Sequence, residues 1–298
     1  MCIVSFQRSP HSWCHTRPGY PHLSLSYEAD RHCQRRELQS LYGPSAQMNV
    51  MASRLHDGLT FPFRGDHTLD LFAVGGLFGL LTAIAVQLAV ALGASNPLLA
   101  LPFVAVATTT MIALLGYLGR VFATTVAADD TPPSFRPLRP LFDTGCRLLV
   151  ITLGYLTLVA ALVGTTITLL TRLPITPDSI DFGGLLLFFG LSTVALVAVL
   201  LVGYTVPIVI GRLATDASAH SSLPLDDGET HSYRTILAHG GYWVSWLFAA
   251  LVVVPGWAFL IIALSSATAL GVVAVFVAFY AHVVATRLAA DGYRRALE

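Results

Sequence analysis

Hydrophobic residues fill four stretches of this chain that contain no Asp, Glu, Lys or Arg: residues 71–119, 148–171, 182–211 and 235–286. A membrane-spanning helix needs about 20 apolar residues, because each residue rises about 1.5 Å through a hydrocarbon core of about 30 Å. Such stretches form helices, since every backbone N–H and C=O group in lipid needs a partner within the protein. The two shorter stretches are long enough for one helix each, and the two longer ones for two each.

Both longer stretches contain a break near the middle. Residues 93–97 read Gly-Ala-Ser-Asn-Pro, a strong turn signal, and residues 265–268 read Ser-Ser-Ala-Thr, a weaker one. The sequence therefore predicts an all-α fold, a polytopic transmembrane bundle of six helices arranged as three helical hairpins. The predicted spans lie near residues 69–92, 98–118, 148–170, 185–210, 242–264 and 267–285.

Composition and charge agree with a membrane protein. Hydrophobic residues make up 55% of the chain and charged residues 11%, whereas soluble domains contain about 25% charged residues. The balance of 17 basic and 17 acidic residues argues against a nucleic-acid partner. The expected surroundings are the lipid bilayer, and the expected location is the cell membrane, which the chain crosses several times.

Arginine placement predicts the orientation. All 17 basic residues are Arg, and all but Arg172 lie before the first span, between spans two and three, between spans four and five, or after span six. Short cytoplasmic loops retain basic residues. We therefore expect the N and C termini to be cytoplasmic.

Residues 1–47 differ from the rest of the chain. They hold three of the four Cys residues and four of the ten His residues, in a spacing that matches no standard zinc finger. They contain no apolar block of the kind found in a secretory signal. We expect a disordered tail, or a start assigned too early, since Met48 and Met51 follow closely. The six-helix membrane domain is then residues 48–298, with no metal or cofactor expected.

The even-numbered spans end in a similar way, which suggests an internal repeat of helical hairpins. A Tyr near the end of each span is followed 11 or 12 residues later by an Asp, with an Arg between them. Aromatic belts and the positive-inside bias could produce the same pattern without a repeat. We expect the three Tyr at one depth and the helix ends to form a cytoplasmic platform that could bind a protein. The residues are Tyr117, Arg120 and Asp129; Tyr204, Arg212 and Asp216; Tyr280, Arg287 and Asp291.

A motif connects spans two and three. It reads Gly-Tyr-Leu-x-Arg at a helix exit, a Pro-x-Phe loop, and Leu-Phe-x-x-Gly-x-Arg entering the next helix. Its residues are Gly116, Tyr117, Arg120, Pro133, Phe135, Leu141, Phe142, Gly145 and Arg147, followed by Tyr155. Over these positions the sequence resembles an archaeal and bacterial family of multispanning membrane proteins, domain of unknown function number four thousand and thirteen.

This chain departs from the family pattern after Phe135, where the family commonly has acidic residues and a Trp. The resemblance implies topology and membership, and it carries no substrate or catalytic residue. From the residues themselves we expect a structural role: the Tyr117 ring at headgroup depth, the Arg120 guanidinium on lipid phosphate, and Gly145 permitting a bend or close backbone approach.

Chemistry-bearing motifs are missing from the spans. No ionisable residue lies near a span centre, where proton relays and coupled transporters usually place one. Gln87 is the strong polar group at depth, either an interhelical hydrogen bond or a polar site. The sequence contains no phosphate-binding Gly-rich loop, no nucleophile elbow and no zinc-protease motif.

These observations predict a protein that is not an enzyme but is structural or accessory in the cell membrane. A transporter or channel for a small or lipidic solute is the alternative. A membrane or cytoplasmic protein, or a second copy of the chain, is the expected partner.

Overall fold

The computed structural model describes residues 44–65, 68–172, 182–219, 233–265 and 269–297. The chain divides into two compact units, residues 1–52 and 53–298. Of the first unit, the structure describes the beginning of helix α2. The predicted tail thus lies largely outside the described residues, and its last positions, 44–47, belong to α2.

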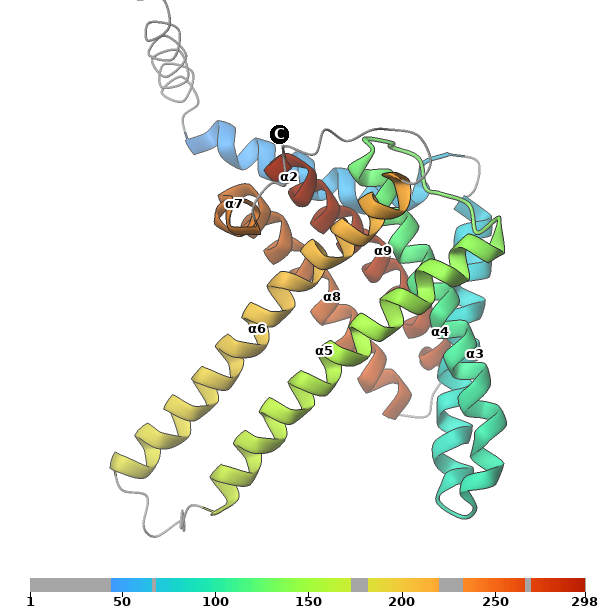
Figure 1. Ribbon diagram of the computed structural model, residues 1–298, viewed down its shortest axis with the longest axis vertical. Coiled ribbons are helices and arrows are strands. Elements are labelled where there is room, and N and C mark those ends of the chain that lie inside the picture. The colour runs from blue at the N-terminus through green and yellow to red at the C-terminus, as the bar shows by residue number, and fades with distance from the viewer. Residues whose placement is uncertain (1–43, 66–67, 173–181, 220–232, 266–268, 298) are drawn as a thin grey trace, which may run out of the picture. The chain divides into compact units, whose positions relative to one another are not determined.

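The described part of the second unit is all-helical, as predicted, and contains six helices long and apolar enough to cross a membrane. Figure 1 shows their order along the chain. The long helices are α3 (Thr68–Gly93), α4 (Pro97–Val126), α5 (Leu138–Arg172), α6 (Phe182–Ala219), α8 (Gly240–Ser265) and α9 (Leu270–Leu297). The shorter elements are α2 (Pro44–Thr60), η1 (Phe61–Phe63) and α7 (Tyr233–Ala238).

The turn between α3 and α4 forms at the predicted Gly-Ala-Ser-Asn-Pro sequence. The Asn96 side chain accepts a hydrogen bond from the backbone N–H of Leu98 at 3.0 Å, which satisfies one of the free donors at the start of α4. Pro97 occupies the first helical position, where its missing N–H costs nothing.

The most extensive contacts join α8 with α9, α3 with α4, and α4 with α5, whereas α5 and α6 contact each other over fewer residues (Figure 1). Helix α9 lies at the centre, because it also contacts α3, α4, α6, α7 and η1. In its most apolar segment 56% of residues are buried, against 6% for α5 and 0% for α6. The α5–α6 pair is therefore the part of the bundle that exposes most of its apolar surface.

The buried core is concentrated at one end of the long helices. One cluster contains Tyr204, Tyr242 and Trp246 of α6 and α8 with the C-terminal half of α9. The other contains Phe61, Tyr117 and Phe135 of η1, α4 and the following loop. Both gather where α4, α6 and α9 end and where α5 and α8 begin, the end that the arginine pattern predicts to be cytoplasmic.

Candidate functional site

Two glycines bring α4 and α5 into close contact at the family motif. A Cβ atom added to Gly116 would lie 2.1 Å from the carbonyl oxygen of Leu141. One added to Gly145 would lie 2.0 Å from the carbonyl oxygen of Ile112. On each helix, a glycine therefore contacts a backbone carbonyl of the other helix. Small residues allow this close approach in membrane helices.

An aromatic stack lies beside this crossing. Phe135, from the loop between α4 and α5, is buried and stacks on the Tyr117 ring with centroids 4.2 Å apart. Phe279 of α9 lies on the same Tyr117 ring, with centroids 6.2 Å apart. Tyr117 is fully buried, and its hydroxyl has no hydrogen-bond partner within the described chain. The ring therefore acts as packing between three segments.

Arg120 binds the loop that follows α4, and not a free surface. Its Nη1 donates to the carbonyl oxygens of Ser134 and Arg136, both at 3.0 Å, and its Nη2 donates to that of Pro137. These carbonyls replace the lipid phosphate that we expected as its partner. The guanidinium has several donors in one plane, which suits it to hold three carbonyls of one turn.

The remaining motif residues are spread along the same junction. Leu141 is buried and Phe142 half-buried against the Tyr117 cluster, while Pro133 is half-buried in the loop and Arg147 is exposed on α5. The motif is thus a packing unit that fixes α4, the loop and α5. Tyr155 lies further along α5, at the cavity described below.

Arg287 of α9 makes a second connection to the end of α4. Its Nη1 donates to Thr125 Oγ1 at 3.1 Å and to the carbonyl oxygen of Asp129 at 2.8 Å, and it pairs with the carboxylate of Asp130. The guanidinium also lies 4.6 Å from the centroid of the Phe61 ring. The backbone N–H and the hydroxyl of Thr131 donate to the Asp129 carboxylate, which lowers its pKa.

The membrane-facing polar residues lie differently from what the sequence suggested. Gln87 is exposed on α3, and its side chain forms no hydrogen bond within the described part of the chain. The buried polar contact between α3 and α4 is instead made by Thr82 and Thr110, whose hydroxyls are 2.7 Å apart. A Thr hydroxyl can donate to a carbonyl of its own helix, so no pattern in the sequence singles out this pair.

Aromatic residues bridge α6 and α8. Pro207 has no N–H, so it leaves the carbonyl oxygen of Gly203, four residues earlier, without its helical donor. Trp246 Nε1 donates to that oxygen at 3.2 Å. The Tyr242 hydroxyl donates to the neighbouring Tyr204 carbonyl at 2.8 Å. The sequence contains the signal for this contact, a Gly four residues before a Pro inside an apolar helix.

A cavity of about 380 Å³ lies next to this bridge. Its walls come from α4, α5, α6, α8 and α9, and include Tyr155, Pro207, Trp246, His282 and Thr286. It does not include Gln87, the polar residue that the sequence places at depth in the first span.

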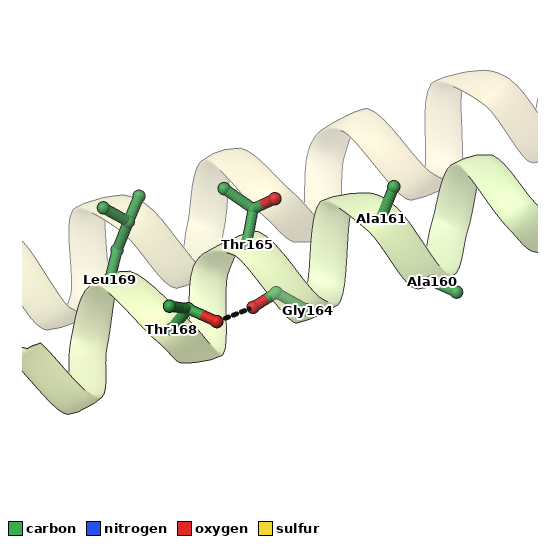
Figure 2. Close-up of a pocket in the computed structure, with 6 residues that line it drawn as sticks. All are labelled: Ala160, Ala161, Gly164, Thr165, Thr168 and Leu169. Atoms are coloured by element: carbon green, nitrogen blue, oxygen red, sulfur yellow. Dashed lines mark hydrogen bonds between the residues drawn. The ribbon is translucent and has the colours of Figure 1, made fainter.

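A second hollow, of about 420 Å³, lies along the outside of α5. Figure 2 shows the residues that line it on successive turns of this helix, with the Thr168 hydroxyl donating to the Gly164 carbonyl at 2.8 Å. A Cβ atom added to Gly164 would meet no atom within 4 Å. The lining residues are Ala160, Ala161, Gly164, Thr165, Thr168 and Leu169.

Metal-binding clusters are not found among the residues that the structure describes, which contain no group of three or more His, Cys, Asp or Glu that could hold an ion. The described side chains pack helices together, donate hydrogen bonds from arginines to backbone carbonyls, and line apolar hollows.

Comparison with known proteins identifies the family. The chain matches no curated protein and no solved structure. Residues 98–267 match the family described as a protein of unknown function, DUF4013. This region runs from the start of α4 to the end of α8, well beyond the motif at residues 116–155. Because it covers more than half of the chain, the protein belongs to the DUF4013 family.

Proposed function

We propose that this protein is a structural or accessory component of the cell membrane that associates with other membrane helices, and that it is not an enzyme. The observation that carries the proposal is the exposure of the α5–α6 pair. None of the most apolar segment of α6 is buried inside the protein, although the other end of the same helix packs tightly through Tyr204 and Ile208.

The outer face of α5 supports association with another helix. Ala160, Gly164 and Thr168 are four residues apart and share one face. Small residues at this spacing let two helix backbones approach closely in a membrane. The hollow over Gly164 has room for such an approach.

The polar groups of the described chain favour an accessory role over catalysis. Arg120 and Arg287 hold backbone carbonyls, and Asp291 pairs with Arg294 and Arg295 of its own helix. These contacts stabilise the end of the bundle that we expect to face the cytoplasm, which would form the platform for a protein partner.

Cysteine cross-linking in native membranes tests the proposal. In a background with all four Cys replaced by Ser, Gly164→Cys should give disulfide-linked or bifunctionally cross-linked protein products. The control is Val254→Cys, which places a thiol on an exposed position of α8. Equal, weak cross-linking at both positions would contradict a specific interface on α5.

The alternative function, a transporter for a lipidic solute, is supported by one observation, the apolar cavity between α6, α8 and α9. Efflux of a fluorescent lipid analogue from proteoliposomes, compared with protein-free vesicles, tests it directly. Protein-dependent movement of the analogue would favour transport over the accessory role.

A further inference from the structure

The cavity beside Trp246 has the size of a ligand site. Its volume of about 380 Å³ falls within the range of about 300–1,000 Å³ that small-molecule pockets occupy. Small residues on facing helices create the space, among them Gly203, Ala249, Ala250, Ala285 and Ala289. The cavity is open to the outside of the bundle, so a ligand could enter it from the surroundings of the helices.

The walls are held in place without help from a ligand. Pro207 frees the Gly203 carbonyl, and Trp246 satisfies it. The Trp246 ring stands at 87° to the Tyr204 ring, with centroids 5.5 Å apart. These contacts join α6 to α8 beside the cavity, so the aromatic bridge forms part of its wall.

His282 lines the cavity but offers it no hydrogen bond. Trp257 Nε1 donates to His282 Nε2 at 3.1 Å, so that nitrogen is the acceptor in a neutral ring. The other nitrogen, Nδ1, then carries the proton and donates to the Ala278 carbonyl at 2.7 Å. Both ring nitrogens are occupied, and the imidazole presents only its ring surface.

Among the residues that line the cavity, two hydroxyl groups remain able to bond to a ligand. Tyr155 and Thr286 both line it, and neither forms a side-chain hydrogen bond within the described part of the chain. The other lining side chains are apolar, apart from the Trp246 indole and His282, which are already paired. A ligand that matches these walls is a hydrocarbon carrying one hydrogen-bonding group.

The rim of the cavity consists of apolar residues on helices that could cross a membrane. Val206, Pro207 and Ile210 of α6 and Ala250 and Val253 of α8 are only partly buried. These residues belong to candidate membrane spans, and in a bilayer lipid chains would surround them. No charged residue is among the lining residues to attract a soluble ion or polar solute.

We propose that this cavity binds the hydrocarbon chain of a lipid, and that the hydroxyls of Tyr155 and Thr286 bond to an ester, carboxyl or alcohol group on it. The site lies at the junction of α5, α6, α8 and α9, so an occupying chain contacts both the exposed α5–α6 pair and the central helix. The inference does not depend on the accessory function proposed above.

Photolabelling of the full-length protein in nanodiscs tests the site. One arm uses a phospholipid with a diazirine on its acyl chain, and the other a diazirine fatty acid; the two distinguish a bilayer lipid from a free acid. Peptide mass spectrometry should place the label on the lining segments, residues 203–210 and 246–253. Label spread evenly over the exposed faces of α5 and α6 in both arms would overturn the proposal.

Two substitutions sharpen the result. Ala250→Phe fills the cavity and should reduce labelling there about tenfold, which corresponds to about 1.4 kcal/mol. Its control, Ala160→Phe, adds the same bulk on the outer face of α5 and should leave labelling unchanged. Tyr155→Phe keeps the ring and removes the hydroxyl, and should reduce labelling about threefold to tenfold, the value of one hydrogen bond.

The substitutions remain informative if the larger side chain disturbs folding. Should Ala250→Phe fail to give a monodisperse protein, Tyr155→Phe with unlabelled lipid as competitor decides the question. Labelling that Tyr155→Phe leaves unchanged and that unlabelled lipid fails to compete away would contradict a specific site.

Discussion

At the residue scale, three tyrosines that look alike in the sequence have different surroundings. The hydroxyls of Tyr204 and Tyr280 donate to the backbone carbonyls of Leu237 and Leu59, at 3.0 and 2.7 Å. That of Tyr117 has no partner in the described chain. Spacing along a helix predicts which face a residue occupies, but the partner of a hydroxyl comes from a segment distant in sequence, and no local pattern contains it.

The Tyr117 hydroxyl gives a direct prediction for stability. A buried hydroxyl without a partner costs free energy, so Tyr117→Phe should leave the free energy of unfolding unchanged or raise it by up to about 1 kcal/mol. The control is Tyr242→Phe, which removes a hydrogen bond of 2.8 Å and should lower it by about 1 kcal/mol. Thermal unfolding in detergent measures both; a large loss for Tyr117→Phe would point to an undetected partner.

Ala128, directly after α4, gives a second prediction. Its φ is +62°, and the N–H groups of Ala128 and Asp129 bond to the carbonyls of Thr125 and Thr124, the pattern of a helix end that favours Gly. Ala128→Gly should raise the free energy of unfolding by about 1 kcal/mol. Ala127→Gly, at a position with negative φ, should not stabilise the protein, and equal effects of the two would argue against this geometry.

At the scale of elements, the uncharged blocks predicted all six long helices, because the cost of charge in lipid is large and local. Helices α4, α5, α6 and α9 extend beyond the spans predicted for the membrane. These helices continue past Arg120, Asp143, Arg212 and Arg287, since a helix that leaves the membrane can carry charges. The depth of packing was not predictable: α6 and α9 are both strongly apolar, yet only α9 is central.

The α4–α5 crossing gives the prediction at this scale. Gly116→Ala and Gly145→Ala each force a Cβ against a backbone carbonyl at about 2 Å, and should lower the free energy of unfolding by about 2–3 kcal/mol. Gly154→Ala on the same helix α5 meets no atom within 4 Å and should be neutral or slightly stabilising. Tm shifts in one detergent compare the three. If Gly154→Ala were as damaging as Gly145→Ala, helix propensity and not close packing would explain the losses.

At the scale of the whole molecule, the positions of the Arg residues predict how the chain is oriented in the membrane, and they are the only basis for that prediction. With N and C termini cytoplasmic, the α3–α4 turn lies outside and the loop after α4 lies inside. In a cysteine-free background, Ser95→Cys should react with a membrane-impermeant maleimide on intact cells. Arg139→Cys, an exposed position, should react only after permeabilisation. The reverse pattern would invert the topology.

The concentration of buried residues at one end of the helices has a mechanical consequence. Helices that are packed against the protein at one end only can change their tilt at the other end, where lipid is their main neighbour. A bilayer that thins or thickens changes the tilt of its helices, and here α5 and α6 have the least protein to resist that change. A change in membrane thickness would therefore first alter the tilt of α5 and α6 at the ends that lack buried contacts. The change in tilt would reach the tightly packed end of the bundle through the crossing of α4 with α5.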